Sequence, residues 1–348
     1  MRNLFFLLFL ITSTFTFAQN VDLSSVDEFF KITDKLKNGE EISDNDWNNF
    51  EKSKAYAIFT NKYIIDIAKL SIRNVFGSCN INIDNSNNLL KTLVLANYEE
   101  INYNYSSLKT FRDNYDFESL IYNAKSRLQS FLMCELDSSV EWKPVYFLFL
   151  SKDGQDRDSA IVIDLNLIYK MTEQQRIDFI AHEFFHVYRS HFENHDFNYA
   201  NDIYFALDMI ANEGIADQID KYNMDYEQYY STVIGFQELK DKFINLYENA
   251  EKDIEYLQDI IVQYSKNQID KETCIDKLLE IYKYNGHALG FYMSNQIIMA
   301  GLKDEMIKEF YKPYEFYRLY SLALYKNKGI SLNDDFLGFL KEATGELD

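Results

Sequence analysis

Cysteine is scarce in this chain: Cys79, Cys134 and Cys274 are the only three among 348 residues. No two of them form a C-x-x-C pair, and an odd number cannot all pair within one chain. The sequence therefore disfavours a disulfide-stapled scaffold and a thiolate zinc site, although one disulfide is possible. A chain of this length can bury an ample core without disulfides.

Basic residues are outnumbered. The chain has 35 Lys and Arg against 55 Asp and Glu, which gives a formal net charge of −20. Such a balance repels the phosphates of nucleic acids and anionic membrane surfaces, so we expect neither as a partner. Proline occurs only twice and no Pro/Gly linker divides the chain, so we expect one compact unit.

Long apolar runs are also missing, apart from a short one at the N-terminus. Arg2 precedes an apolar stretch over residues 4–11, and Thr16-Phe17-Ala18 follows as a small-x-small sequence. This pattern predicts a secretory signal peptide over residues 1–18. Because no later run of eighteen apolar residues exists, we expect no stable membrane insertion after cleavage. The mature protein should be exported, either periplasmic or secreted, with a net charge of −21 after loss of Arg2.

Histidine is rare as well, and two of the five stand in His182-Glu183-Phe184-Phe185-His186. Each residue of an α-helix advances roughly 100°, so His182 and His186 lie about 40° apart on one face and can hold one Zn²⁺. Glu183 can then reach a water on the metal without being a ligand itself. Imidazole ligands leave the metal strongly Lewis acidic. The motif is typical of the active-site helix of a zinc metallopeptidase.

The surroundings of the motif predict a buried helix. Thr172 and Gln175 form a capping box, so the helix should begin there and end near Arg189 or Ser190. Its residues are apolar on nearly every side, which is typical of a helix in a domain core. A buried His and Glu need polar partners, and a metal with its water supplies them.

A catalytic zinc site keeps three protein ligands, so a third must come from elsewhere. Glu213 and Asp217 share a face at i and i+4 of a helical pattern over residues 202–222. Gly214, together with Ala216, removes bulk and should let this helix approach the one with the two histidines. We expect Glu213 to be the third ligand, and Asp217 to accept the free N–H of a ligand His.

Two other histidines are weaker candidates for the third ligand. His191 points away from His186 if the helix continues. His195 can return to the metal only through a turn at residues 193–194. A third His in the H-E-x-x-H-x-x-G-x-x-H pattern is excluded, since Arg189 and Phe192 occupy the later positions of that pattern.

Together, H-E-F-F-H and the later N-E-G-I-A-D over residues 212–217 resemble the gluzincin pattern, in which H-E-x-x-H precedes a helical E-x-x-x-D. The resemblance implies one zinc per chain, with His182, His186 and Glu213 as ligands, Glu183 as general base and Asp217 as the residue that orients a ligand His. The chain lacks the thermolysin-like edge-strand motif and the G-x-M-E-N signature of the large aminopeptidases. It is most similar to a little-characterised bacterial family of zinc-dependent peptidases with N-E-G-x-A-D. Residues 36–56 and 284–290 resemble the N- and C-terminal regions of that family.

The rest of the chain predicts a mostly α (α+β) fold. Residues 19–140 read as an N-terminal helical subdomain, with helices over residues 46–54, started by Ser43, and over residues 57–72. Residues 141–348 read as the zincin-like catalytic region. Apolar runs at 145–150 and 160–165, separated by turn residues, predict a small antiparallel hairpin. Residues 159–164 are a candidate edge for an extended peptide, although an ordinary hairpin covering the core is as good an interpretation.

The gluzincin resemblance also implies a donor that stabilises the oxyanion from a later segment. His287 follows Gly286 at the start of an apolar helix over residues 288–299, so it is the first candidate, with Tyr284 and Tyr292 as alternates. A structural His at a helix junction is an equally good interpretation. The sequence thus predicts a zinc peptidase acting on a peptide or protein substrate. A non-catalytic protein that retains the zinc site, or a zinc hydrolase of esters or other amides, remains the alternative.

Overall fold

Helices dominate the computed structural model, which describes residues 21–77, 88–192, 202–222, 237–283 and 286–344. The predicted mostly α (α+β) class is confirmed. The helices before the sheet are α1 (Ser24–Lys37), α2 (Asp44–Lys52), α3 (Lys54–Phe59), α4 (Lys62–Phe76), α5 (Leu89–Tyr103), α6 (Tyr105–Asn114) and α7 (Phe117–Leu132). Those after it are α8 (Leu165–Lys170), α9 (Glu173–Phe192), α10 (Asp202–Asp220), α12 (Gln237–Glu248), α13 (Ala250–Ser265), α14 (Lys271–Ile281), α15 (His287–Met299), α16 (Lys303–Lys308), α17 (Pro313–Lys328) and α18 (Asp334–Thr344).

Capping side chains decide where the early helices begin. Ser43 starts α2, as the sequence predicts, and forms a capping box with Asp46, although the helix covers Asp44–Lys52 rather than residues 46–54. The single helix predicted over residues 57–72 is wrong, because two helices, α3 and α4, cover this stretch. Thr60 is extended between them, and the Asn61 side chain accepts a hydrogen bond from the Ile64 N–H to start α4.

The sheet is mixed and contains four strands in the order β1-β2-β4-β3. The strands are β1 (Val21–Asp22), β2 (Val145–Leu148), β3 (Gly154–Asp156) and β4 (Ile161–Asp164). β2 pairs in parallel with both β1 and β4, while β3 is antiparallel to β4. The predicted antiparallel hairpin between the two apolar runs is therefore wrong. The segment between them, expected to be a turn, folds back as β3 and takes the antiparallel position.

This topology also moves the open edge of the sheet. All four residues of β4 are buried, and β4 is paired on both sides, so the predicted edge at residues 159–164 is wrong. An apolar strand buried on both faces is typical of parallel pairing and gives no alternation to mark an edge. The edge strand beside β4 is β3, which packs against α9, and β1 forms the other edge of the sheet.

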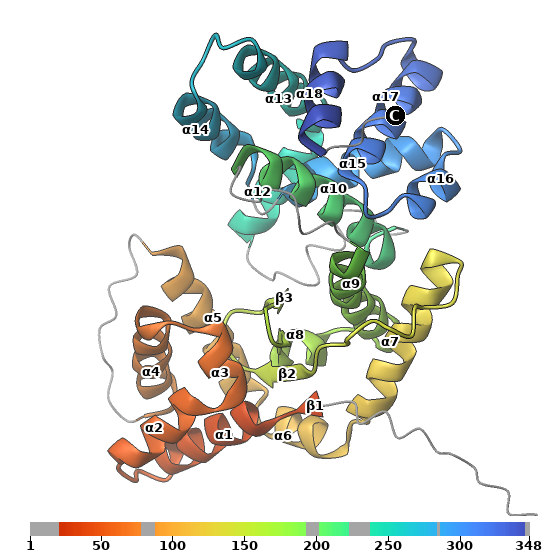
Figure 1. Ribbon diagram of the computed structural model, residues 1–348. Helices are drawn as coiled ribbons and strands as arrows, with labels where there is room; N and C mark the ends of the chain where they lie inside the picture. The colour runs from red at the N-terminus through yellow and green to blue at the C-terminus, as the bar shows by residue number, and fades with distance from the viewer. Residues whose placement is uncertain (1–20, 78–87, 193–201, 223–236, 284–285, 345–348) are drawn as a thin grey trace, which may run out of the picture.

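The sheet and the helices α1–α7 lie in one half of the molecule, the helices α12–α18 lie in the other, and α9 and α10 lie where the halves meet (Figure 1). The N-terminal residues are not separate from the later ones, since β1 extends the sheet and α7 packs along α9. The hydroxyls of Tyr56 and Tyr98 both donate to the Phe149 carbonyl, at 2.6 and 3.0 Å. The predicted division at residue 140 stays a prediction.

Close contact between α10 and α15 depends on two glycines. A Cβ atom at Gly290 would lie 2.2 Å from the Ile210 carbonyl oxygen, and one at Gly214 would lie 2.5 Å from the Gly290 carbonyl. We expected Gly214 to admit the helix that carries the histidines, but the helix that it admits is α15. The α9–α10 contact is held instead by a buried ion pair in which Arg189 donates to Asp208.

The predictions for the signal peptide, the cysteines and membrane insertion can be compared with the described residues. The predicted signal peptide lies outside the described residues, and so does Cys79. Cys134 is exposed and Cys274 is buried, and both are free thiols. No described helix is long and apolar enough to cross a membrane.

Candidate metal centre

The two histidines and Glu183 stand in the middle of α9. The predicted capping box is confirmed: the Thr172 N–H donates to Gln175 Oε1 at 2.9 Å, and the Gln175 N–H donates to Thr172 Oγ1 at 3.3 Å. The helix is buried at this level, as its apolar pattern predicts, with His182 and Glu183 each 4% exposed. Its position against α10 brings Glu213, 5% exposed, opposite the two imidazoles.

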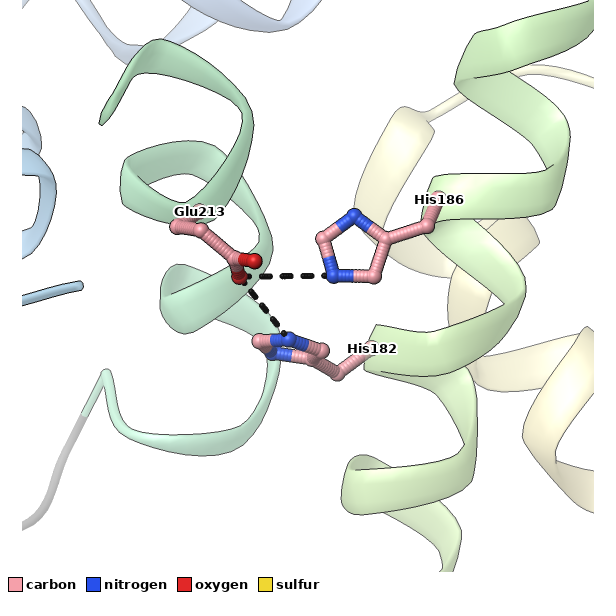
Figure 2. A group of neighbouring side chains, drawn as sticks. All are labelled: His182, His186 and Glu213. Carbon is pink, nitrogen blue, oxygen red and sulfur yellow. Dashed lines mark ion pairs between the residues drawn. The ribbon is translucent and has the colours of Figure 1, made fainter. Parts of the chain in front are cut away.

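One oxygen of Glu213 faces both imidazoles. Glu213 Oε2 lies 3.5 Å from His182 Nε2 and 3.4 Å from His186 Nε2 (Figure 2). Neither contact has hydrogen-bond geometry, and this oxygen is buried without any hydrogen-bond partner. A buried oxygen without a partner is costly, so a cation is the natural occupant of this position. Two ligands bound to zinc at about 2.0–2.1 Å in a tetrahedron lie roughly 3.3–3.4 Å apart, close to the separations seen here.

The other nitrogen of each imidazole is held by α10. His182 Nδ1 lies 3.1 Å from Asp220 Oδ1, and His186 Nδ1 lies 3.0 Å from Asn212 Oδ1. These oxygens only accept hydrogen bonds, so each Nδ1 carries the proton and each Nε2 keeps its lone pair for a metal. The residues His182, His186 and Glu213 therefore fit zinc in number, spacing and tautomer.

Asp217 was expected to accept the free N–H of a ligand His, but its hydrogen-bond partner is a different residue. Its Oδ1 lies 3.6 Å from His182 Nδ1, farther than the oxygen of Asp220. Instead Asp217 accepts a hydrogen bond from His287 Nδ1, at 3.1 Å to Oδ1 and 3.2 Å to Oδ2. The residue that orients His182 is therefore Asp220, one helical turn further along α10.

His287 begins α15, as predicted, after Gly286 in the left-handed conformation at φ 78°. Its ring stacks on that of His182 with centroids 6.0 Å apart, and its Nδ1 lies 3.4 Å from Glu213 Oε2. The structure therefore brings His287 to the metal centre. Among the alternates, Tyr292 donates to Glu251 at 3.2 Å, and Tyr284 lies outside the described residues.

Lys221 supplies a fixed positive charge behind these residues. Its ammonium donates to Asp217 and lies 3.4 Å from Asp220 Oδ2. Two further groups of metal-binding type occur here, His182 with Asp217 and Asp220, and Glu213 with Asp217 and His287. Because the ammonium contacts the carboxylates of both groups, we assign zinc only to the group of His182, His186 and Glu213.

Glu183 lies beside the proposed ligands and under the edge strand. Burial raises the pKa of Glu183 to about 7, against the opposing effect of His182 and His186. The Cβ position of Gly154 in β3 lies 3.6 Å from Glu183 Oε1, and any larger residue there would collide with Phe179. Gly154 thus lets the backbone of β3 pass directly over the carboxylate.

The charges of the centre reinforce one another. Burial alone lowers the pKa of His182, but the carboxylates of Asp220 and Glu213 outweigh it and raise the pKa well above the ordinary value. The same carboxylates that favour a proton on this ring favour a metal cation, which would take the place of the proton at Nε2. Burial alone raises the pKa of Glu213, but His287 and His186 outweigh it and hold the pKa well below the ordinary value. Glu213 is therefore ionised, as a metal ligand must be.

Other candidates are not part of the centre. His191 contacts Ser139 through its Nε2 at 3.2 Å, away from the metal centre, as its helical position predicts. His195 lies outside the described residues. Sequence reasoning missed Asp220 and Asn212, although Asp220 follows Glu213 at i+7 and Asp217 at i+3 on one helix face.

A comparison with known families also indicates zinc. A family model described as "Putative zinc dependent peptidase (DUF5700)" matches residues 47–329. This description confirms the resemblance to a family of zinc-dependent peptidases and supports zinc as the metal. No curated protein and no solved structure matches the chain.

Proposed function

This chain belongs to the DUF5700 family, and we propose that it is an exported zinc-dependent peptidase that hydrolyses peptide bonds. One observation carries the proposal. The buried oxygen of Glu213 lacks a hydrogen-bond partner and faces the Nε2 atoms of His182 and His186, beside a buried carboxylate, Glu183. A structural zinc site has no use for that fourth side chain, whereas hydrolysis requires a base there.

Each side chain has a distinct part in the proposed mechanism. Bound by His182, His186 and Glu213, zinc supplies a Lewis acid that polarises a carbonyl group and makes water more acidic. Glu183 accepts the proton of the attacking water and passes it to the leaving amine, and a pKa of about 7 suits both steps. Asp220 and Asn212 hold the imidazoles in the required tautomer.

The backbone of β3 gives the substrate a place to bind. Asp164 N donates to the Asp153 carbonyl and Arg157 N donates to the Ala160 carbonyl, so these residues form hydrogen-bonded pairs across β3 and β4. Such pairs alternate in an antiparallel ladder, and therefore Gly154 and Asp156 turn their backbone groups away from β4, to the open edge. The Gly154 N–H there donates to Asp153 Oδ1, so the groups offered to a peptide are the Gly154 carbonyl and the N–H and carbonyl of Asp156. An extended peptide that adds to this edge brings a peptide bond over Glu183.

His287 is suited to stabilise the developing negative charge. Its Nδ1 is engaged by Asp217, and no hydrogen bond to its Nε2 occurs among the described residues. Burial alone lowers the pKa of His287, but Glu213 and Asp217 outweigh it and raise the pKa, which favours an N–H at Nε2. A charged donor of this kind stabilises an oxyanion more in the transition state than in the ground state.

Export rests on the predicted signal peptide, residues 1–18, and places the enzyme in the periplasm or outside the cell. The same metal chemistry serves ester hydrolysis, but the backbone groups that β3 turns away from β4 favour a substrate with its own peptide backbone. A non-catalytic zinc protein would not retain Glu183 at the position of a base.

The test replaces Glu183 by Gln in the mature protein. Gln cannot accept a proton, so cleavage of a mixed peptide library should fall by orders of magnitude while one zinc per chain remains bound. Glu141→Gln, a change of the same type at an exposed residue, serves as the control. Wild-type turnover in Glu183→Gln, or a wild-type protein that cleaves no peptide and is unaffected by chelator, contradicts the proposal.

A further inference from the structure

Asp153 stands immediately before the edge strand β3, at the level of Glu183. Side chains alternate along a strand, so Asp153 and Gln155 share one face. Gln155 Nε2 donates to Asp153 Oδ2 at 2.5 Å, and the Gly154 N–H donates to Oδ1 at 2.9 Å. These neutral donors fix the direction of the carboxylate without neutralising its charge.

The charge of Asp153 reaches the proposed reaction centre. It contributes to the raised pKa of Glu183, and His287 acts in turn on the Asp153 carboxylate. The side chain is exposed to solvent, yet burial is the largest influence on its pKa and raises it. Because this carboxylate is exposed beside β3, a peptide that binds along the strand can contact it.

The neighbouring charges on the same segment already have partners. Asp156 accepts from Lys143 Nζ at 2.7 and 2.8 Å, and Lys152 donates to Glu100. The Arg157 guanidinium lies over the Phe59 ring at 4.9 Å, although its charge still acts on Asp153. Within the described residues Asp153 has no ion pair closer than 4 Å, which distinguishes it from Asp156.

The excess of acidic residues in the chain favours a cation beside Asp153. The mature chain carries a net charge of −21, so its field attracts cationic peptides.

We propose that Asp153 determines substrate specificity by pairing with a cationic group of the bound peptide. This inference rests on the proposed peptidase function. A peptide added to the β3 edge alternates its side chains as β3 does, so every second substrate residue meets the face that carries Asp153 and Gln155. The cation is an ammonium or guanidinium group, supplied either by a Lys or Arg side chain near the scissile bond or by a free N-terminus.

The experiment measures cleavage and binding of matched peptides. The series holds one sequence with Lys, Arg or norleucine at each position around the cleaved bond, each made with a free and with an acetylated N-terminus. The wild-type enzyme should prefer the cationic member by roughly 10- to 100-fold in kcat/KM, as expected for a charge-assisted hydrogen bond. The position that carries the preference separates a side chain from the N-terminal amine.

Asp153→Asn is compared with Asp158→Asn, which removes the same charge from an exposed residue beyond β3. The cationic-to-neutral ratio should fall towards one in Asp153→Asn and stay near the wild-type value in Asp158→Asn. Dissociation constants of the same peptides, measured in the Glu183→Gln background where no turnover occurs, should show that Asp153→Asn loses the preference for cationic peptides.

Three results overturn the inference. Equal cleavage of cationic and neutral peptides by the wild type, or a preference that survives Asp153→Asn, overturns it and leaves the peptidase function standing. If the wild type neither cleaves nor binds any peptide of the series, the proposed function fails and the inference fails with it.

Discussion

His182 Nδ1 lies 3.1 Å from Asp220 Oδ1, and the Nε2 atom of the same ring lies 3.5 Å from the unpartnered oxygen of Glu213. Asp220 thus determines which nitrogen of His182 is free to bind a metal. The two carboxylates stand on one helix, α10, seven positions apart in the sequence.

Replacing Asp220 by Asn should weaken zinc binding by about 10- to 100-fold, because the hydrogen bond that fixes the His182 tautomer loses its charge. Asp217→Asn, the matched change on the same helix, should weaken zinc binding less, since Asp217 accepts its hydrogen bond from His287 and not from a proposed ligand. Zinc dissociation constants from competition with a chelator test this. A larger loss in Asp217→Asn than in Asp220→Asn would return the orienting role to Asp217.

Replacing Glu213 by Ala should reduce zinc affinity by several orders of magnitude, because it removes one of three proposed ligands. His191→Ala, on α9 but bonded to Ser139, should keep one zinc per chain. Metal content after dialysis measures the difference. Zinc should also raise the midpoint of thermal unfolding of the wild type and not that of Glu213→Ala, since only the native site binds it. Full occupancy in Glu213→Ala would assign the third ligand to another residue.

His287→Ala should lower kcat by roughly 10²–10³ with zinc content and fold intact, as expected for loss of an oxyanion donor. Asp217→Asn should lower kcat in the same direction, because it removes the charge that orients His287. Steady-state kinetics with parallel melting curves decide the matter. A lower melting temperature with normal turnover of the folded protein would make His287 a structural residue.

Gly290→Ala should destabilise the fold by about 2 kcal/mol or more, because the added methyl group collides with the backbone of α10. Gly338→Ala is the matched control: it also lies in a helix, and its Cβ position meets nothing within 4 Å. That control should stabilise the protein by about 0.5–1 kcal/mol. Urea unfolding measures both changes. Equal effects of the two substitutions would refute the close packing of α10 on α15.

Asp46 should make stability depend on pH in the acid range. Hydrogen bonds from Lys35 and Ser43 lower the pKa of Asp46 from 3.8 to about 2. The stabilisation is therefore complete above pH 4 and is lost as the pH falls towards 2. Asp46→Asn should be less stable than the wild type at pH 5, and the difference should shrink by pH 2. Urea midpoints across this range test it, and a constant difference would contradict the assignment.

Local patterns in the sequence determined the helix that carries the histidines and its capping box at Thr172 and Gln175. They also determined the start of α15 at Gly286 and His287. Each of these depends on hydrogen bonds and side-chain spacing within a few residues, so the sequence alone predicts them. The proposed ligand set follows from the same reasoning, because His182, His186 and Glu213 lie on predictable faces of two helices.

Tertiary structure decided how the strands pair and which histidine each of Asp217 and Asp220 contacts. β2 pairs in parallel with β4, and three residues of an expected turn become β3; such pairing is fixed by packing far along the chain rather than by local pattern. Asp217 and Asp220 differ by three residues on one helix, so a modest rotation of α10 exchanges their partners. That rotation is fixed where Gly214 meets Gly290, because only a pair without side chains allows the two backbones to approach so closely.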